Sequence, residues 1–160
     1  MLADKNILPK PGFRARELFA MKYMLIRKRL VRLFNTKEKT METVMPVLQI
    51  LIAFTIFNVW LLRYGKSTDW RGGEAKNMKE EFKVYGLPLW SVGVVGFLKV
   101  LFAVLLIAGI WYPVLIAPAA LGIAVLMAGA MIMHFKVEDP IKKSIPSFTL
   151  LSLSLIVALF

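Results

Sequence analysis

The chain has 160 residues, of which 58% are apolar and none is cysteine, and its formal net charge at pH 7 is +11. A soluble domain rarely reaches this apolar content, so the composition favours a membrane protein. The lack of cysteine excludes disulfides, thiolate metal ligands and thiol relay chemistry carried by this chain.

Positive charge is concentrated at the N-terminus. Residues 1–40 hold eleven Lys and Arg against three Asp and Glu, a net charge of +8. Two prolines predict an extended segment over residues 1–12, and residues 13–35 are expected to form a basic amphipathic helix at the lipid headgroups. A solvated basic arm is the alternative. A nucleic-acid partner is not expected, because the neighbouring membrane span explains the charge.

Four apolar stretches are each long enough to cross about 30 Å of hydrocarbon at about 1.5 Å per residue. They cover residues 43–62, 87–110, 114–135 and 144–160. Pro46 falls in the first turn of the first stretch, where a missing N–H costs little. We therefore predict an all-α fold: an integral membrane four-helix bundle over residues 41–160, preceded by the N-terminal basic arm of residues 1–40.

The connections between the spans differ in polarity. The first, residues 65–86, is charged, and we expect a short surface helix within residues 74–83. Arg63, Arg71 and Glu81 are expected to be mostly solvated charges. The connection between the second and third spans has no charges and predicts a tight hairpin. Residues 136–143 form a second polar loop.

The charge distribution also predicts an orientation. Basic residues beside a first span stay in the cytoplasm. Four spans place both termini on the same side, so the N- and C-termini are expected to be cytoplasmic. The predicted location is the bacterial cytoplasmic, or inner, membrane.

Lys99 lies near the middle of the second span. An ionisable side chain at that depth is costly and usually faces a protein interior or a wet cavity. Three interpretations remain open: the amine reaches an interface, it makes an internal polar contact, or it handles a ligand. Any charged partner has to come from a loop end, another subunit or a lipid phosphate, since none of the four stretches contains Asp or Glu.

Three other polar residues are candidate contacts. His134, the only histidine, is expected to bond a loop backbone near the end of the third span; a proton donor at a pocket is the alternative. Asp139 precedes Pro140 and is expected to form a turn or helix N-cap. Asn58 and Gln49, both in the first span, are expected to form hydrogen bonds to neighbouring helices. We predict no catalytic residue and no metal site, because no carboxylate or cysteine cluster accompanies His134.

Small residues indicate where helices approach closely. In lipid, backbone contact through small side chains drives helix association. The third span carries a stripe of such residues at helical spacing, and two glycines of the second span could form the opposing surface. The predicted packing residues are Ala117, Ala120, Ala124, Ala128, Gly93 and Gly96.

The region from Glu81 to Ile156 resembles the DoxX-like family of four-helix membrane proteins. The residues that carry the likeness are Tyr85-Gly86-Leu87-Pro88, Val92-Gly93, Gly96-Phe97-Leu98-Lys99, Ala119-Ala120-Leu121-Gly122, His134 and Asp139-Pro140. The resemblance implies a four-helix membrane fold. Some relatives are subunits of membrane oxidoreductases that pass electrons to quinone and others are chaperones, and a shared fold does not by itself define a function. Family members often carry Glu at the position of Lys99, and a lysine there suits an anion instead.

Three functions fit these observations. The leading hypothesis is a non-enzymatic membrane subunit or assembly factor without its own redox cofactor. The second is a quinone-site subunit of an oxidoreductase, with Lys99 and His134 bonding the quinone oxygens. The third is a lipid-binding or small transport protein. The expected partners are membrane lipids and other membrane subunits or further copies of the chain, with quinone or lipid as the ligands to consider.

Overall fold

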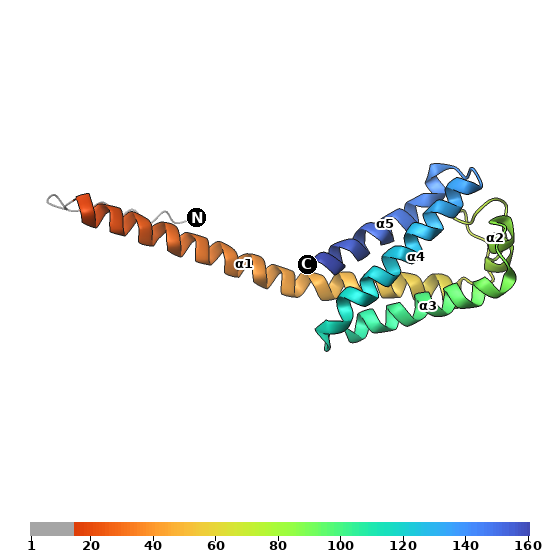
Figure 1. Cartoon of the computed structure of the whole chain (residues 1–160), viewed down its shortest axis with the longest axis horizontal. Helices are drawn as coiled ribbons and strands as arrows, with labels where there is room; N and C mark the ends of the chain where they lie inside the picture. Colours follow the sequence, from red (N-terminus) through yellow and green to blue (C-terminus); the bar gives the residue numbers. More distant parts are fainter. Residues whose placement is uncertain (1–14) are drawn as a thin grey trace. The chain divides into compact units, whose positions relative to one another are not determined.

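The computed structural model describes residues 15–160, and within them every regular element is helical (Figure 1). The expected extended segment over residues 1–12 lies outside the described residues. The elements are α1 (Ala15–Phe57), a π-helical turn η1 (Asn58–Leu62), α2 (Met78–Val84), α3 (Leu89–Ala108), a 3₁₀ turn η2 (Pro113–Leu115), α4 (Ile116–Lys136) and α5 (Ile141–Leu159).

The described chain divides into two compact units, residues 15–43 and residues 44–160. The first is the N-terminal part of α1, and nearly all of its described side chains are exposed. The predicted helix over residues 13–35 is therefore present from Ala15 onward. Its apolar residues include a stripe at helical spacing, formed by Phe19, Tyr23, Ile26, Leu30, Leu33 and Phe34.

The predicted break between this helix and the first span is absent. No glycine or proline lies between residues 36 and 42, and the hydroxyl of Thr40 donates to the Thr36 carbonyl within the helix. Pro46 consequently lies inside α1 rather than in a first turn. Because proline has no N–H, the carbonyl of Glu42 loses its helical partner there.

The second unit contains four helices that are long and apolar enough to cross a membrane, counting the C-terminal part of α1 with η1. The predicted four-helix membrane bundle is confirmed. α4 packs against both α3 and α5, and the chain reverses between α3 and α4 through η2 (Figure 1). The second polar loop is shorter than predicted, because α5 already begins at Ile141.

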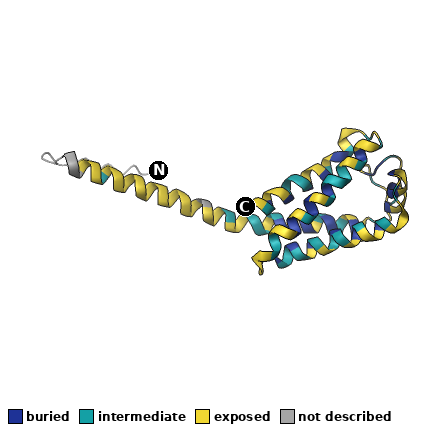
Figure 2. Cartoon of the chain, in the orientation of Figure 1, coloured by how far each residue is buried: buried dark blue, intermediate teal, exposed yellow. Residues whose placement is uncertain are grey.

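The core of the bundle is built from side chains of all four long helices. Ile52, Ile56, Leu106 and Ile123 are almost completely buried, and Val157 of α5 joins the same cluster. Many large apolar side chains of these helices are exposed, and the exposed positions are yellow in Figure 2. Such an outer surface suits contact with lipid, because no hydrophobic driving force buries apolar side chains that are already surrounded by lipid tails.

The small-residue prediction holds only in part. Ala120 and Ala124 are buried and Ala128 is half-buried, whereas Ala117 is exposed. The remaining two predicted positions are glycines of α3. Gly96 packs so closely against the Trp60 ring that an added methyl group would clash, but Gly93 is exposed and has no such neighbour within 4 Å. Gly93 lies three residues before Gly96 in α3, and it is exposed on the outside of the described bundle.

Hydrogen bonds from side chains stabilise the start of α2, where backbone N–H groups have no partner within the helix. Asn77 caps the helix by accepting the N–H of Glu80 at 3.0 Å. Glu80 in turn accepts the N–H of Lys76 at 2.8 Å. This reciprocal capping stabilises a helix that is too short to form alone. The predicted surface helix is therefore present, over fewer residues than expected.

Candidate functional site

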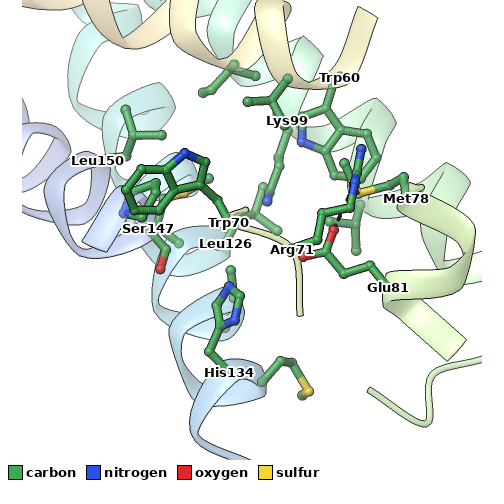
Figure 3. A pocket seen from close by; sticks show the side chains of 18 of the residues that line it. Trp60, Trp70, Arg71, Met78, Glu81, Lys99, Leu126, His134, Ser147 and Leu150 are labelled. Atoms are coloured by element: carbon green, nitrogen blue, oxygen red, sulfur yellow. Dashed lines mark hydrogen bonds and ion pairs between the residues drawn. The ribbon is translucent and has the colours of Figure 1, made fainter. Parts of the chain in front are cut away.

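A cavity of about 370 Å³ lies inside the second unit, between η1, α3, α4, α5 and the segment that carries α2 (Figure 3). Most of its wall is apolar, with contributions from Val59, Val95, Met127, Ala130 and Leu150. A small number of polar side chains also reach it. Ligand sites in proteins commonly combine an apolar wall with a few converging polar groups.

Lys99 points into this cavity from the middle of α3 (Figure 3). It is ten residues from the first residue of α3, about 15 Å along the helix axis. The side chain is 9% exposed, and its Nζ makes no hydrogen bond or ion pair with any residue that the structure describes. Its closest polar interaction is with the face of Trp60, 5.2 Å from Nζ to the ring centroid. The buried amine on the cavity wall does not fit the first interpretation, a reach to an interface, and it is compatible with an internal contact or a ligand.

The position of Trp60 depends on two features of its surroundings. The π-helical turn is closed by the bond from the Arg63 N–H to the Asn58 carbonyl, at 2.9 Å, and Trp60 is its one buried residue. Gly96 leaves room for the indole ring, and the edge of Phe82 contacts it at 6.3 Å between centroids. Trp60 is therefore fixed beside Lys99.

Arg71 and Glu81 form a buried ion pair at one end of the cavity. The Arg71 Nη1 atom donates to Glu81 Oε2 at 2.9 Å, and the two residues are 5% and 9% exposed. The guanidinium also donates to the carbonyls of Arg63, Tyr64 and Lys66. The expectation that Arg71 and Glu81 are solvated is wrong, because their segment folds over the end of the bundle. Arg63 is exposed, as expected.

The second oxygen of Glu81 is also occupied. Oε1 accepts the Gly72 N–H and the Tyr85 hydroxyl, each at 3.0 Å. A side chain at residue 72 would clash with the Tyr85 ring, and Gly73 has a φ of +53°, which favours glycine. The two glycines after Arg71 therefore let the backbone approach Tyr85 and Glu81 closely.

His134 is 5% exposed and lines the same cavity. Its Nδ1 atom lies 2.8 Å from Oδ2 of Asp139. The other oxygen of Asp139 accepts the Gly73 N–H at 2.9 Å and lies 3.3 Å from Nζ of Lys143. His134 bonds a carboxylate and not the loop backbone that we expected. Asp139 is neither a simple turn residue nor an N-cap, since Pro140 caps α5.

The environment of Asp139 sets its charge state. Burial acts to raise the pKa of its carboxyl, but the bonds from His134, the Gly73 N–H and Lys143 outweigh burial and hold the pKa below its ordinary value. Asp139 is therefore ionised at neutral pH and joins the 63–77 segment to the end of α4 and the start of α5.

Tyr85 lies between the Arg71–Glu81 ion pair and the His134–Asp139 pair. Its hydroxyl donates to Glu81, and its ring meets the His134 ring edge-on at 5.7 Å between centroids. Burial first, and then the charge of Glu81, raise the pKa of the Tyr85 hydroxyl, so it stays protonated as a donor. A continuous polar network thus runs from Arg71 to Lys143 along one end of the cavity.

Residues 68–157, more than half of the chain, match the DoxX-like family. The chain belongs to the DoxX-like family. No curated protein and no solved structure matches the chain. The matched range of this DoxX-like protein contains Lys99, Arg71, Glu81, Tyr85 and the His134–Asp139 pair, and it excludes all of α1 and Trp60.

The remaining predicted contacts of the DoxX-like chain lie elsewhere. Asn58 is half-buried, does not line the cavity and makes no side-chain hydrogen bond with a described residue. Gln49 is 1% exposed, and its Nε2 atom has no partner within the described chain. Neither bridges helices as predicted. No group of three metal-binding side chains occurs among residues 15–160.

The polar residues that sequence reasoning missed had a signal. Glu81 and Tyr85 are spaced i, i+4 and therefore share one helix face. Arg71 is followed directly by two glycines, a pattern typical of a tightly held backbone. The sequence could not show that the two features meet, because that contact depends on how the segment folds over the bundle.

Proposed function

We propose that this DoxX-like membrane protein binds a small, largely apolar molecule in the cavity among its four spans. One observation carries the proposal: the buried amine of Lys99, which has no hydrogen-bond or ion-pair partner among the described residues, points into a cavity of about 370 Å³ whose wall is otherwise mostly apolar. A purely structural lysine would be expected to have a carboxylate or carbonyl partner.

Two ligand classes from the sequence analysis are compatible with this site. A quinone would offer its oxygens to Lys99 and His134, both of which line the cavity. A lipid would offer a headgroup or carboxylate oxygen to Lys99 and its tail to the apolar wall. Either ligand would place an oxygen acceptor at the Lys99 amine. The proposed function is therefore the binding of such a ligand, whichever class it belongs to.

Filling the cavity tests the proposal. Gly129 lines the cavity, and an added Cβ there meets no atom within 4 Å, so Gly129→Leu occupies the space without a clash at the Cβ. Gly93 of α3 has the same free surroundings but lies away from the cavity, which makes Gly93→Leu the matched control. Mass spectrometry of molecules that copurify in mild detergent should detect a ligand in the wild type and in Gly93→Leu, and lose it in Gly129→Leu. An identical set of small molecules in all three would end the proposal.

The first unit supports a second role, as a subunit or assembly factor of a larger membrane complex. Its apolar stripe is exposed from Phe19 to Phe34 and is flanked by basic side chains such as Lys22, Arg27 and Arg29. A helix of this kind binds either an anionic membrane surface or another protein. We favour a partner subunit, without a redox cofactor bound by this chain.

Two paired variants test the second role. Ile26→Ser with Leu30→Ser interrupts the centre of the stripe, whereas Met24→Ser with Val31→Ser removes equally exposed apolar residues on the other side of the helix. Native mass spectrometry should show a copurifying membrane protein with the control pair and lose it with the stripe pair. Equal recovery with both pairs would contradict a partner on the stripe.

The proposed setting is the bacterial inner membrane, with both termini in the cytoplasm. The support is the net charge of +8 in residues 1–40, beside the first span. Because the chain has no cysteine, single cysteines report topology cleanly. A membrane-impermeant maleimide applied to intact cells should label Ser67→Cys and spare Thr40→Cys. The reverse pattern would invert the orientation.

A further inference from the structure

The charges around the cavity do not balance within the described chain. Arg71 is paired with Glu81, and Asp139 is shared between His134 and Lys143. Among the residues that the structure describes, Lys99 is the remaining buried cation on the wall, and none of their carboxylates lies within 4 Å of its amine.

Neither nearby carboxylate is free to turn toward Lys99. Each oxygen of Glu81 already accepts hydrogen bonds, one from Arg71 and the other from the Gly72 N–H and Tyr85. Each oxygen of Asp139 is likewise engaged. Moving either carboxylate would leave a buried hydrogen-bond partner unsatisfied, which is strongly destabilising.

Trp60 lies beside the amine of Lys99. The face of an aromatic ring attracts a cation, and the attraction grows as water is excluded. Here Nζ lies 5.2 Å from the indole centroid. The ammonium thus has an aromatic face on one side and no carboxylate of the described residues within 4 Å, so an anion bound in the cavity would supply its counter-charge.

We propose that the ligand of this cavity is an apolar molecule with one anionic oxygen group, a carboxylate or an enolate, that binds the Lys99 ammonium. The wall available to its apolar body includes Leu126, Leu150 and Trp70 (Figure 3). This inference rests on the proposed ligand-binding function and narrows it from any oxygen acceptor to an anion. A neutral quinone satisfies the function but not this inference.

Matched probes test the charge directly on purified full-length protein. Naphthoate and its methyl ester have the same ring system, and so do a hydroxynaphthoquinone enolate and its methyl ether. Calorimetry in detergent at neutral pH should give each anion at least about tenfold tighter binding than its neutral partner, as expected for a charge-assisted bond. The acid–ester pair reports on a carboxylate ligand and the quinone pair on an enolate.

Three variants assign the preference to Lys99. Lys99→Met should remove the preference for the anion while leaving ester binding unchanged. Lys99→Arg should keep the preference, because it keeps the charge. Lys83→Met removes an exposed lysine of α2 and should behave as wild type.

The outcomes separate this inference from the proposed function. Equal affinity of wild type for the anion and the neutral compound in both pairs overturns the anion assignment and leaves ligand binding intact, whereas a preference in one pair identifies the anionic group. Binding of none of the four probes also overturns the assignment. The function itself is judged by whether Gly129→Leu displaces a copurified ligand.

Discussion

The Nδ1 atom of His134 lies 2.8 Å from Oδ2 of Asp139, and both side chains are almost completely buried, at 7% and 3% exposed. The contact joins the end of α4 to the turn before α5. The other oxygen of the carboxylate accepts the Gly73 N–H. One carboxylate therefore ties three segments together at the end of the cavity.

Asp139→Asn should destabilise the second unit by about 1–3 kcal/mol, because charged hydrogen bonds become neutral ones. Thermal unfolding in detergent measures the loss. Glu138→Gln, at the neighbouring exposed position, is the control and should change stability little. Equal unfolding temperatures for both variants would show that the Asp139 contacts add nothing.

Stability should fall in acid through Asp139. Its pKa in the folded protein is below the ordinary value of 3.8, so between the two values the unfolded chain binds more protons than the folded chain. The contribution of Asp139 is present above pH 3.8 and is lost as pH falls through the lower, folded value. Unfolding measured from neutral pH downward should show the wild type losing its advantage over Asp139→Asn in this acidic range.

Glu81→Gln should cost about 3 kcal/mol of stability, because Arg71 is left as an uncompensated buried charge. The guanidinium keeps its carbonyl partners, so the loss should come from charge and not from unfolding of the segment. Lys79→Met, which removes an exposed charge of α2, is the control. Thermal unfolding of Glu81→Gln matching that of Lys79→Met would contradict a stabilising pair.

Gly72→Ala should destabilise the protein by about 1–3 kcal/mol, because the new methyl group clashes with the Tyr85 ring. Gly65→Ala is the matched control, since an added Cβ there meets no atom within 4 Å. Chemical denaturation of both proteins measures the difference. Similar midpoints would mean that Tyr85 moves aside at little cost.

The sequence alone determined the membrane class, the four spans and the family. A long apolar run forms a helix in lipid, because each of its backbone N–H and C=O groups must be hydrogen-bonded within the same segment. The sequence also selected Lys99, since a charge at mid-span has few explanations. Local patterns sufficed here because span length and depth are properties of one segment at a time.

Only the tertiary structure decided which polar groups meet. Arg71 and Glu81 read as solvated charges, and their burial follows from the folding of residues 63–77 over the bundle end. Asp139 and Gly73 are 66 residues apart in sequence, and no local pattern links them. The position of the Lys99 amine also depends on how separate helices pack. It lies beside Trp60 and has no described carboxylate within 4 Å.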